Sequence, residues 1–368
     1  MGKLCIIDVI APLYRKKIFQ LLDSEYKCVW LFGKAREGIK ELDWRTLSNV
    51  QEAKNIKLFG PIYYQKNCLK TFFHKDITAF LVNGEPYCLS SWLITLFALF
   101  SSHKKVYFWS HGWYGKEGFL KRLIKKLYFK LPTGSFIYGS YAKDLMVKEG
   151  IAENKIFVIH NSLDYDNQIR IREKLHETKI YEDHFHNKNN NLIFIGRLTP
   201  VKQLDLVIKA IDLLKNKGLS INLTFVGDGS EKEKLSALTR DLNLESQVWF
   251  YGACYDEDIN AELIFNSDLC VAPGNVGLTA IHCMTFGTPV ITHNDFSLQM
   301  PEFESIKENQ TGGFFLPNDV KSMSDCIESW LLSHTNRNEV REACYKEIDS
   351  YWTPDFQMEV FKKNLIIE

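Results

Sequence analysis

The stretch NLIFIGRLTPVKQLDLVIKAIDLLKNKGLSINLTFVGDG, residues 191–229, decides the fold. It opens with an apolar run typical of a buried strand and continues as a helical pattern that ends at Gly218. It then returns to a second apolar strand, INLTFV, before a glycine turn. A strand, a helix and another strand in succession predict a parallel sheet covered by helices.

The same alternation extends over most of the chain and predicts an α/β fold with two domains. Apolar strand-like runs recur before this stretch (LCIIDVI, KCVWLFGK, ITAFLVNG, KVYFWSHG, FIYGS, KIFVIHN) and after it (QVWFYG, DLCVAPG, PVITHND). The polar segment 166–190 is the predicted linker region. It separates a Rossmann-like domain over 1–165 from a second one over 191–350. Residues 351–368 form an amphipathic helix that Thr353 could cap, with Pro354 at its first position.

Composition limits the function classes. Forty-five Lys and Arg balance 45 Asp and Glu, so the net charge is zero, which argues against a general nucleic-acid binder. The nine cysteines form no C-x-x-C pair, and buried thiols in a reducing cytosol are expected. The N-terminus lacks the pattern of a signal peptide. The most apolar segment, residues 88–100, falls short of the ~20 residues of a spanning helix and is predicted to be a buried helix.

Two glycine turns are candidate ligand sites. Gly196 ends the first strand, and Arg197 and Lys202 follow it in the loop that enters the next helix. Two cations beside a helix N-terminus suit a diphosphate, although a turn with two solvated cations would read the same way. Gly227 and Gly229 flank Asp228 after the next strand, which is weak evidence by itself.

A third candidate is APGNVGLTAIHCMTFGTPVITHND, residues 272–295. Gly274 and Gly277 keep its loop free of side chains, and a helix beginning near Leu278 offers unpaired N–H groups. The loop and the first helical turn contain no Asp, Glu, Lys or Arg. Any chemistry performed here must therefore take its charges from elsewhere.

Together the three segments resemble the C-terminal half of the retaining GT-B glycosyltransferases of the family-4, or group 1, type. The resemblance rests on the order strand-GR-x4-K-helix, strand-GDG-helix, a glycine loop and G-T-P-V-I. It extends to FIYGSYAKDLMVKEGIAENKIFVIHNSLD, which is similar to the segment that closes the family's first domain, and to the YWTPDF helix. It implies two Rossmann-like domains that face each other across a cleft, with the last helix crossing back to the first domain.

The resemblance also implies an activity: transfer of a sugar from a UDP- or GDP-linked donor, with retention of configuration, in bacterial-type surface polysaccharide, lipopolysaccharide or capsule synthesis. No cofactor and no metal are expected. Arg197 and Lys202 would grip the diphosphate, and His111 would reach the donor sugar from the first domain. The remaining donor-binding positions that it implies are Gly196, Gly227, Asp228, Gly229, Tyr251, Gly252, Gly274, Asn275, Val276, Gly277, Leu278, Thr279 and His282.

One departure from the family pattern is plain. The family's E-x7-E pair before G-x-P-V-I falls here on Gly274 and His282. One alternative is an active variant that uses the backbone amides of 275–279, with His282 meeting the ribose through a neutral ring nitrogen. Another is a catalytically inactive nucleotide-sugar-binding or scaffold subunit, and a third is an epimerase of the same fold.

The acceptor side is predicted in the first domain, with Pro12, Tyr14 and Arg15 in its opening loop and Arg15 available to an acceptor phosphate. Residues 119–131 form an amphipathic helix. Its apolar face would hold Phe119, Leu120, Leu123, Ile124, Leu127 and Tyr128, and its basic face Lys121, Arg122, Lys125, Lys126 and Lys130. The helix is either core-packed with a solvated basic face or held against anionic lipid. The second alternative suits a polyprenyl-diphosphate-linked glycan acceptor and a cytoplasmic protein at the inner membrane face.

Overall fold

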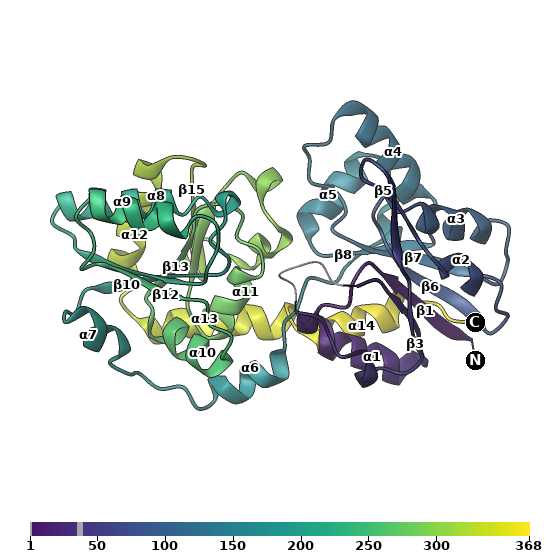
Figure 1. Ribbon diagram of the computed structural model, residues 1–368, viewed down its shortest axis with the longest axis horizontal. Coiled ribbons are helices and arrows are strands. Elements are labelled where there is room, and N and C mark those ends of the chain that lie inside the picture. Colours follow the sequence, from purple (N-terminus) through teal and green to yellow (C-terminus); the bar gives the residue numbers. More distant parts are fainter. Residues whose placement is uncertain (1, 35–39) are drawn as a thin grey trace. The chain divides into compact units, whose positions relative to one another are not determined.

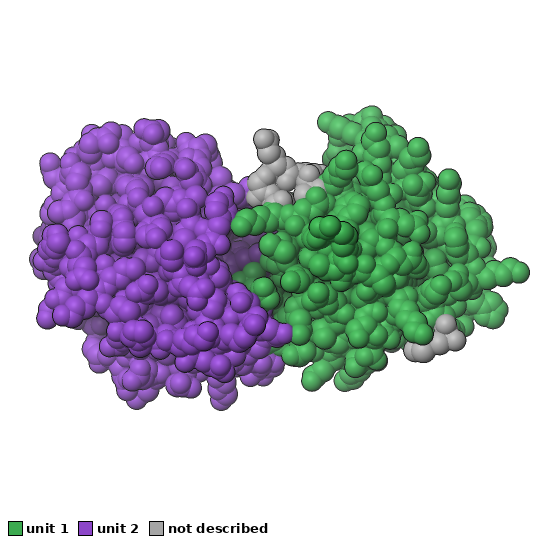
Figure 2. Space-filling view, turned by 60° about the horizontal axis from the view of Figure 1, so that its bottom comes forward, with its two compact units in different colours: residues 1–164, 353–368 green, residues 165–352 purple. Residues whose placement is uncertain are grey.

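The computed structural model describes residues 2–34 and 40–368. The chain forms two compact units, one made of Met1–Asp164 with Thr353–Glu368 and the other of Tyr165–Trp352 (Figures 1 and 2). We call them unit 1 and unit 2. Each is built on a parallel sheet, and the α/β fold with two Rossmann-like domains is confirmed.

Unit 1 contains a seven-stranded sheet in the order β3-β2-β1-β6-β7-β8-β9, with every pair parallel. The order reverses between β1 and β6, so this is the unit's topological switch point, outside which open α/β sheets bind ligands. The strands are β1 (Lys3–Asp8), β2 (Val29–Phe32), β3 (Val50–Glu52), β6 (Ile77–Asn83), β7 (Lys105–Ser110), β8 (Gly134–Ile137) and β9 (Ile156–Val158). Its helices are α1 (Lys16–Tyr26), α2 (Cys68–Thr71), α3 (Leu89–Ala98), α4 (Phe119–Lys130), α5 (Ser140–Lys148) and α14 (Pro354–Asn364), and an antiparallel hairpin joins β4 (Asn55–Phe59) to β5 (Ile62–Gln65).

Unit 2 contains a six-stranded sheet in the order β12-β11-β10-β13-β14-β15, again all parallel. Its switch point lies between β10 and β13. The strands are β10 (Asn190–Ile195), β11 (Ile221–Val226), β12 (Val248–Gly252), β13 (Leu269–Ala272), β14 (Val290–His293) and β15 (Gly312–Phe315). The helices are α6 (Tyr165–Arg172), α7 (Ile180–Phe185), α8 (Asp205–Asn216), α9 (Lys232–Asp241), α10 (Glu257–Asn266), α11 (Thr279–Thr285), α12 (Val320–Ser333) and α13 (Arg337–Tyr351).

The stretch that decides the fold forms β10, α8 and β11. Leu192, Ile193 and Phe194 are fully buried because the central strands of a parallel sheet are covered on both faces. In α8 the buried positions are Val207, Ile208, Ala210, Ile211 and Leu214, a helical stripe that packs on the sheet.

Residues 166–190, treated above as a linker region, contain nearly all of α6 and the whole of α7 and belong to unit 2. The buried Tyr181 explains how so polar a segment is held. Its hydroxyl donates to the carbonyl of Leu263 at 2.7 Å and lies 2.8 Å from Ser267 Oγ.

The last helix, α14, returns to unit 1. The expected cap is confirmed, since Thr353 Oγ1 accepts a hydrogen bond from the Phe356 N–H at 3.1 Å and Pro354 occupies the first helical position. Phe361 inserts between aromatic rings of β7 and β8, with centroids 5.2 Å from Trp109 and 4.5 Å from Phe136.

The helix predicted within residues 88–100 is confirmed as α3, but the prediction that it is buried is wrong. Cys88 and Ile94 are buried, but Phe100 exposes 91% of its surface and Leu99 is also exposed. The reason is that α3 has one covered face, toward the sheet, while its outer face carries apolar side chains as well. None of the helices in the described residues is long and apolar enough to cross a membrane.

Candidate functional site

The predicted donor residues of unit 2 gather outside the carboxyl ends of β10 and β13, at the switch point. Gly196 and Arg197 follow β10, and the Gly274 loop follows β13. Thr279 Oγ1 at the start of α11 donates to the carbonyl of Ile195 at 2.9 Å, which fastens the two segments together. The chain therefore brings its predicted diphosphate segment and its acid-free loop to the same edge of the unit 2 sheet.

Lys202 ends the short turn η4 (Pro200–Lys202) and reaches into that loop. Its Nζ donates to the main-chain carbonyl of Asn275 at 2.6 Å and to Asn275 Oδ1 at 2.8 Å. Burial lowers the pKa of Lys202 to about 8, with the charge of Arg197 acting in the same direction and that of Glu302 opposing it. Arg197 itself is exposed, so one partly buried cation and one exposed cation follow β10 at this edge of the sheet.

The glycine turns allow close backbone contact at this edge of the sheet. A Cβ on Gly227 would lie 1.9 Å from the carbonyl oxygen of Gly196, and one on Gly229 would lie 2.3 Å from that of Leu198. The Gly227 N–H donates to the Gly252 carbonyl at 2.8 Å, so the predicted nucleoside turn adjoins the Tyr251 and Gly252 strand end. These glycines are needed for packing whether or not a ligand binds.

One main-chain amide of the Gly274 loop already has a partner inside the protein. Residues 275–279 were expected to offer amides to a ligand, but the Val276 N–H already donates to Gln299 Oε1 at 2.9 Å. Gln299 is buried and also donates to Thr292 Oγ1 at 2.8 Å, so it orders the loop from behind. Sequence reasoning missed Gln299 because it lies 23 residues away and belongs to no motif.

His282, on α11, is paired with a carboxylate that the sequence did not connect to it. Its Nε2 lies 3.0 Å from Glu257 Oε1, and Gln168 Nε2 donates to the same oxygen at 2.8 Å. Burial alone would raise the pKa of Glu257, but the charge and hydrogen bond of His282, together with hydrogen bonds from Gln168 and Asn260, leave that pKa below its usual value. A carboxylate is therefore present near this position, supplied by α10 rather than α11.

In unit 1, a buried polar cluster lies at the switch point between β1 and β6. Asp8, at the end of β1, accepts from Arg15 Nη1 at 2.9 Å and from Asn83 Nδ2 at 3.2 Å. Arg15 Nη2 also donates to the hydroxyl of Tyr138. Arg15, predicted as a ligand for an acceptor phosphate, thus contacts Asp8 and Tyr138 through its two terminal nitrogens. Pro12 and Tyr14 lie in the same loop, at the start of η1 (Leu13–Arg15).

His111 follows β7 and lies beside this cluster. Its ring centroid is 4.8 Å from that of Tyr138. Burial lowers the pKa of His111 to about 4, and the neighbouring charges of Arg15 and Lys125 add to that effect. The imidazole is therefore neutral at physiological pH and can exchange hydrogen bonds with a hydroxyl group.

A groove of about 580 Å³ adjoins the same edge of the unit 1 sheet. It is bordered by Val9, which follows Asp8, and by Tyr63, Glu85 and Tyr87. The Tyr63 hydroxyl donates to Glu85 Oε2 at 3.0 Å. Aromatic side chains and polar groups thus line this groove together.

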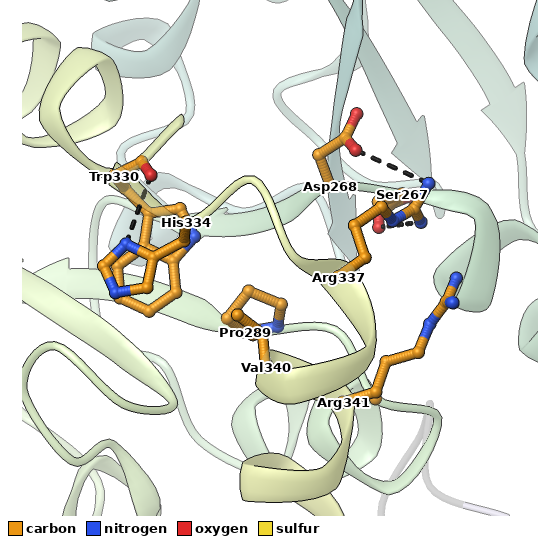
Figure 3. A pocket seen from close by; sticks show the side chains of 9 residues that line it. Ser267, Asp268, Pro289, Trp330, His334, Arg337, Val340 and Arg341 are labelled. Atoms are coloured by element: carbon orange, nitrogen blue, oxygen red, sulfur yellow. Dashed lines mark hydrogen bonds and ion pairs between the residues drawn. The ribbon is translucent and has the colours of Figure 1, made fainter. Parts of the chain in front are cut away.

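A second pocket, shown in Figure 3, lies at the opposite, amino end of β13 and does not include the predicted residues. Its arginines have structural partners. Arg337 Nη2 donates to the carbonyls of Phe265 and Ser267, each at 2.9 Å, and Arg341 Nη2 donates to the Phe265 carbonyl at 3.1 Å. Among the described residues, no group of three or more His, Cys, Asp or Glu side chains could hold a metal ion.

Comparison with known proteins agrees with this fold. Residues 177–347 match the family model of the glycosyl transferases group 1. Over 99% of both chains the structure resembles that of Anabaena Alr3699/HepE in complex with UDP, with a TM-score of 0.73 and 15% sequence identity. This likeness shows the GT-B fold. The matched segment, which makes up most of unit 2, belongs to the group 1 glycosyltransferase family.

Two curated relatives from Staphylococcus aureus each match just under half of the chain. Protein CapJ is 30% identical over 186 residues, which are 47% of this chain and 45% of that protein. A poly(ribitol-phosphate) alpha-N-acetylglucosaminyltransferase is 25% identical over 46% of this chain and 33% of its own length. The chain thus spans less than two thirds of the length of these relatives.

Proposed function

We propose that this protein is a glycosyltransferase that moves a sugar from a nucleotide-diphospho-sugar to a glycan or lipid-linked glycan during polysaccharide synthesis. The observation that carries the proposal is the placement of Lys202 and Arg197 at the switch point of unit 2, beside a loop free of acidic side chains. The family match and the UDP complex of a protein with the same fold support a nucleotide donor.

The chemistry follows from charge. As the glycosyl–phosphate bond breaks, negative charge grows on the diphosphate, and Lys202 and Arg197 would neutralise it from fixed positions. Because Lys202 is already held by Asn275, little reorganisation is needed at the moment of reaction. Neutral His111 would contact a hydroxyl of the transferred sugar, and we propose retention of configuration from the resemblance of the motifs.

The nucleoside end would rest on Tyr251, Gly252 and the Gly227–Gly229 turn. His282 directs Nε2 toward Glu257, which leaves Nδ1 for a ribose hydroxyl. Glu257 would thereby supply, through His282, the carboxylate that the family pattern places directly on α11. The pairing of His282 with Glu257 favours an active enzyme. The alternative is an inactive sugar-nucleotide-binding subunit, and the observation that supports this alternative is the absence of a side chain at Gly274.

For the acceptor we propose the unit 1 groove beside Tyr63 and Tyr87. A lipid-linked acceptor is supported by α4, whose outer face exposes Phe119, Leu120, Leu123, Ile124 and Leu127. The sequence left open whether this apolar face, which includes Tyr128, packs on the core or contacts lipid, and of this set only Tyr128 is buried. With exposed Lys121 and Lys130 beside them, they would hold the protein peripherally on an anionic cytoplasmic membrane surface.

The test is nucleotide release from a panel of UDP- and GDP-sugars, with and without a polyprenyl-diphosphate-linked saccharide. Turnover of one donor is expected, with Arg197→Ala and Lys202→Met each reducing kcat/KM at least about 100-fold. Arg240→Ala, which removes an exposed arginine on α9, is the matched control. UDP binding without turnover of any donor would support the inactive subunit. Equal kcat/KM in the Arg197 and control variants would contradict the proposed diphosphate site.

A further inference from the structure

The loop that carries His111 is fastened to α4 by a buried ion pair. Lys125 Nζ lies 2.6 Å from Glu117 Oε1, and the two side chains expose only 7% and 2% of their surface. Lys125 was predicted to lie on the basic face of this helix, where it could contact a membrane surface. Because its side chain is buried, Lys125 is not part of that exposed face. Burying two charges is costly unless their geometry is good and further hydrogen bonds satisfy them.

Those further hydrogen bonds all go to the His111 loop. Lys125 Nζ donates to the carbonyl of Gly112 at 2.7 Å. The Glu117 carboxylate accepts from the N–H groups of Tyr114 at 3.0 Å and Gly115 at 2.9 Å. The pair thus holds the main chain directly after His111 at three points. Gly112 and Gly115 have φ values of +69° and +89°, which suit glycine and let the loop fold tightly around the pair.

We propose that Lys125 and Glu117 are positioning residues for the reaction, which fix the His111 loop and set the charge around the imidazole. This inference rests on the proposed role of His111 toward the donor sugar. It explains why a lysine occurs on the inward side of α4, where an apolar residue would pack at lower cost. It also separates Lys125 in function from the exposed lysines of the same helix.

Within the described residues of unit 1, four segments bring charged or titratable groups close to His111. They are Arg15 from η1, Lys125 from α4, Tyr138 after β8 and Tyr114 in the loop itself. Each of the two cations has a carboxylate partner, since Arg15 pairs with Asp8 and Lys125 with Glu117. Removing the charge of Lys125 takes away one of the two cations that disfavour imidazolium, so His111 should become easier to protonate.

The experiment is an NMR titration of His111 in the full chain, labelled with ¹³C at histidine and assigned with His111→Asn. Lys125→Met keeps the apolar stem and removes the charge. It should raise the titration midpoint of His111 by about one pH unit and reduce kcat for donor turnover by about tenfold to 100-fold. UDP affinity, a property of unit 2, should not change. Lys148→Met removes an exposed lysine from the neighbouring helix α5 and should move none of these values.

If Lys125→Met does not fold, Lys125→Gln keeps a hydrogen-bond donor for Gly112 and should raise the midpoint of His111 in the same direction. A folded Lys125 variant whose His111 midpoint and kcat equal those of wild type would overturn the proposal. The NMR titration needs no turnover, so it decides whether the pair sets the charge at His111 even if no donor is ever consumed. Absence of turnover with a shifted midpoint would count against the proposed function and not against the pair.

Discussion

At the scale of single residues, Gly274 has no room for the glutamate that the family pattern places there. A Cβ on residue 274 would lie 2.0 Å from the carbonyl oxygen of Val201, and the Gly274 N–H donates to the Lys202 carbonyl at 2.9 Å. We expect Gly274→Ala to displace the loop. The free energy of unfolding should fall by about 1–3 kcal/mol and UDP affinity by at least about tenfold. Denaturant unfolding and calorimetric titration with UDP measure the two effects.

Gly313→Ala is the matched control in the same unit, because the nearest atom to its added Cβ would be Cys326 Sγ at 3.4 Å, an ordinary contact. Its free energy of unfolding should stay within about 1 kcal/mol of wild type. The prediction would be contradicted if Gly274→Ala were as stable as Gly313→Ala and bound UDP with wild-type affinity. In that case the loop would accommodate the added methyl group without loss of stability or affinity.

Lys202 makes donor binding depend on pH. Burial lowers its pKa to about 8, so the side chain is charged below that pH and progressively neutral above it. Attraction to a diphosphate is therefore present at low pH and lost as pH rises. UDP affinity measured from pH 6.5 to 9.5 should fall above about pH 8 in the wild type. In Lys202→Met it should be weak at pH 6.5 and change little. A wild-type affinity independent of pH would exclude Lys202 as a diphosphate ligand.

At the scale of elements, α14 completes unit 1 although it is distant in sequence. Phe361 is fully buried, and Gln357 links the helix to Ser162 Oγ at 2.7 Å and to the His160 carbonyl at 2.8 Å. Phe361→Ala should reduce the free energy of unfolding of unit 1 by about 3–5 kcal/mol. Urea unfolding followed by tryptophan fluorescence measures this loss. Tyr351→Ala, at a half-exposed ring outside α14, should cost about 1 kcal/mol or less, and equal losses in both variants would contradict the assigned packing.

The elements also show what the sequence could and could not predict. The spacing of apolar residues predicted β10, α8 and β11, and the glycine turns predicted the candidate site residues Gly196, Lys202 and Gly274. Both patterns lie within short stretches of sequence, so they can be recognised without knowing the fold. The pairing of His282 with Glu257 and the support of the loop by Gln299 join residues that only the fold brings together. The apolar residues of α3 and α4 indicated that each helix has an apolar surface. They do not indicate whether that surface contacts protein, lipid or water.

At the scale of the whole molecule, charge and apolar surface are distributed unevenly although the net charge is zero. In the described residues, most of the large exposed apolar side chains belong to unit 1, with Phe119 at 85% and Phe100 at 91% exposure. Neither α3 nor α4 contains an acidic residue, and α4 carries five basic ones. Arg122 is paired with Glu149 at 2.6 Å and Lys125 is buried, which leaves Lys121, Lys126 and Lys130 to face an anionic surface.

This distribution predicts binding to anionic bilayers through both apolar insertion and charge. In sedimentation with vesicles, the wild type should bind phosphatidylglycerol–phosphatidylcholine mixtures at least about tenfold more tightly than phosphatidylcholine alone, because each lysine near the surface adds about 1 kcal/mol. Phe119→Ser with Leu120→Ser should weaken binding to both compositions, whereas Lys126→Gln with Lys130→Gln should remove mainly the difference between them. Leu332→Ser, at an equally exposed leucine on α12 of unit 2, should bind like wild type. Equal binding by the wild type and the Phe119/Leu120 variant would show that the apolar face of α4 has another partner.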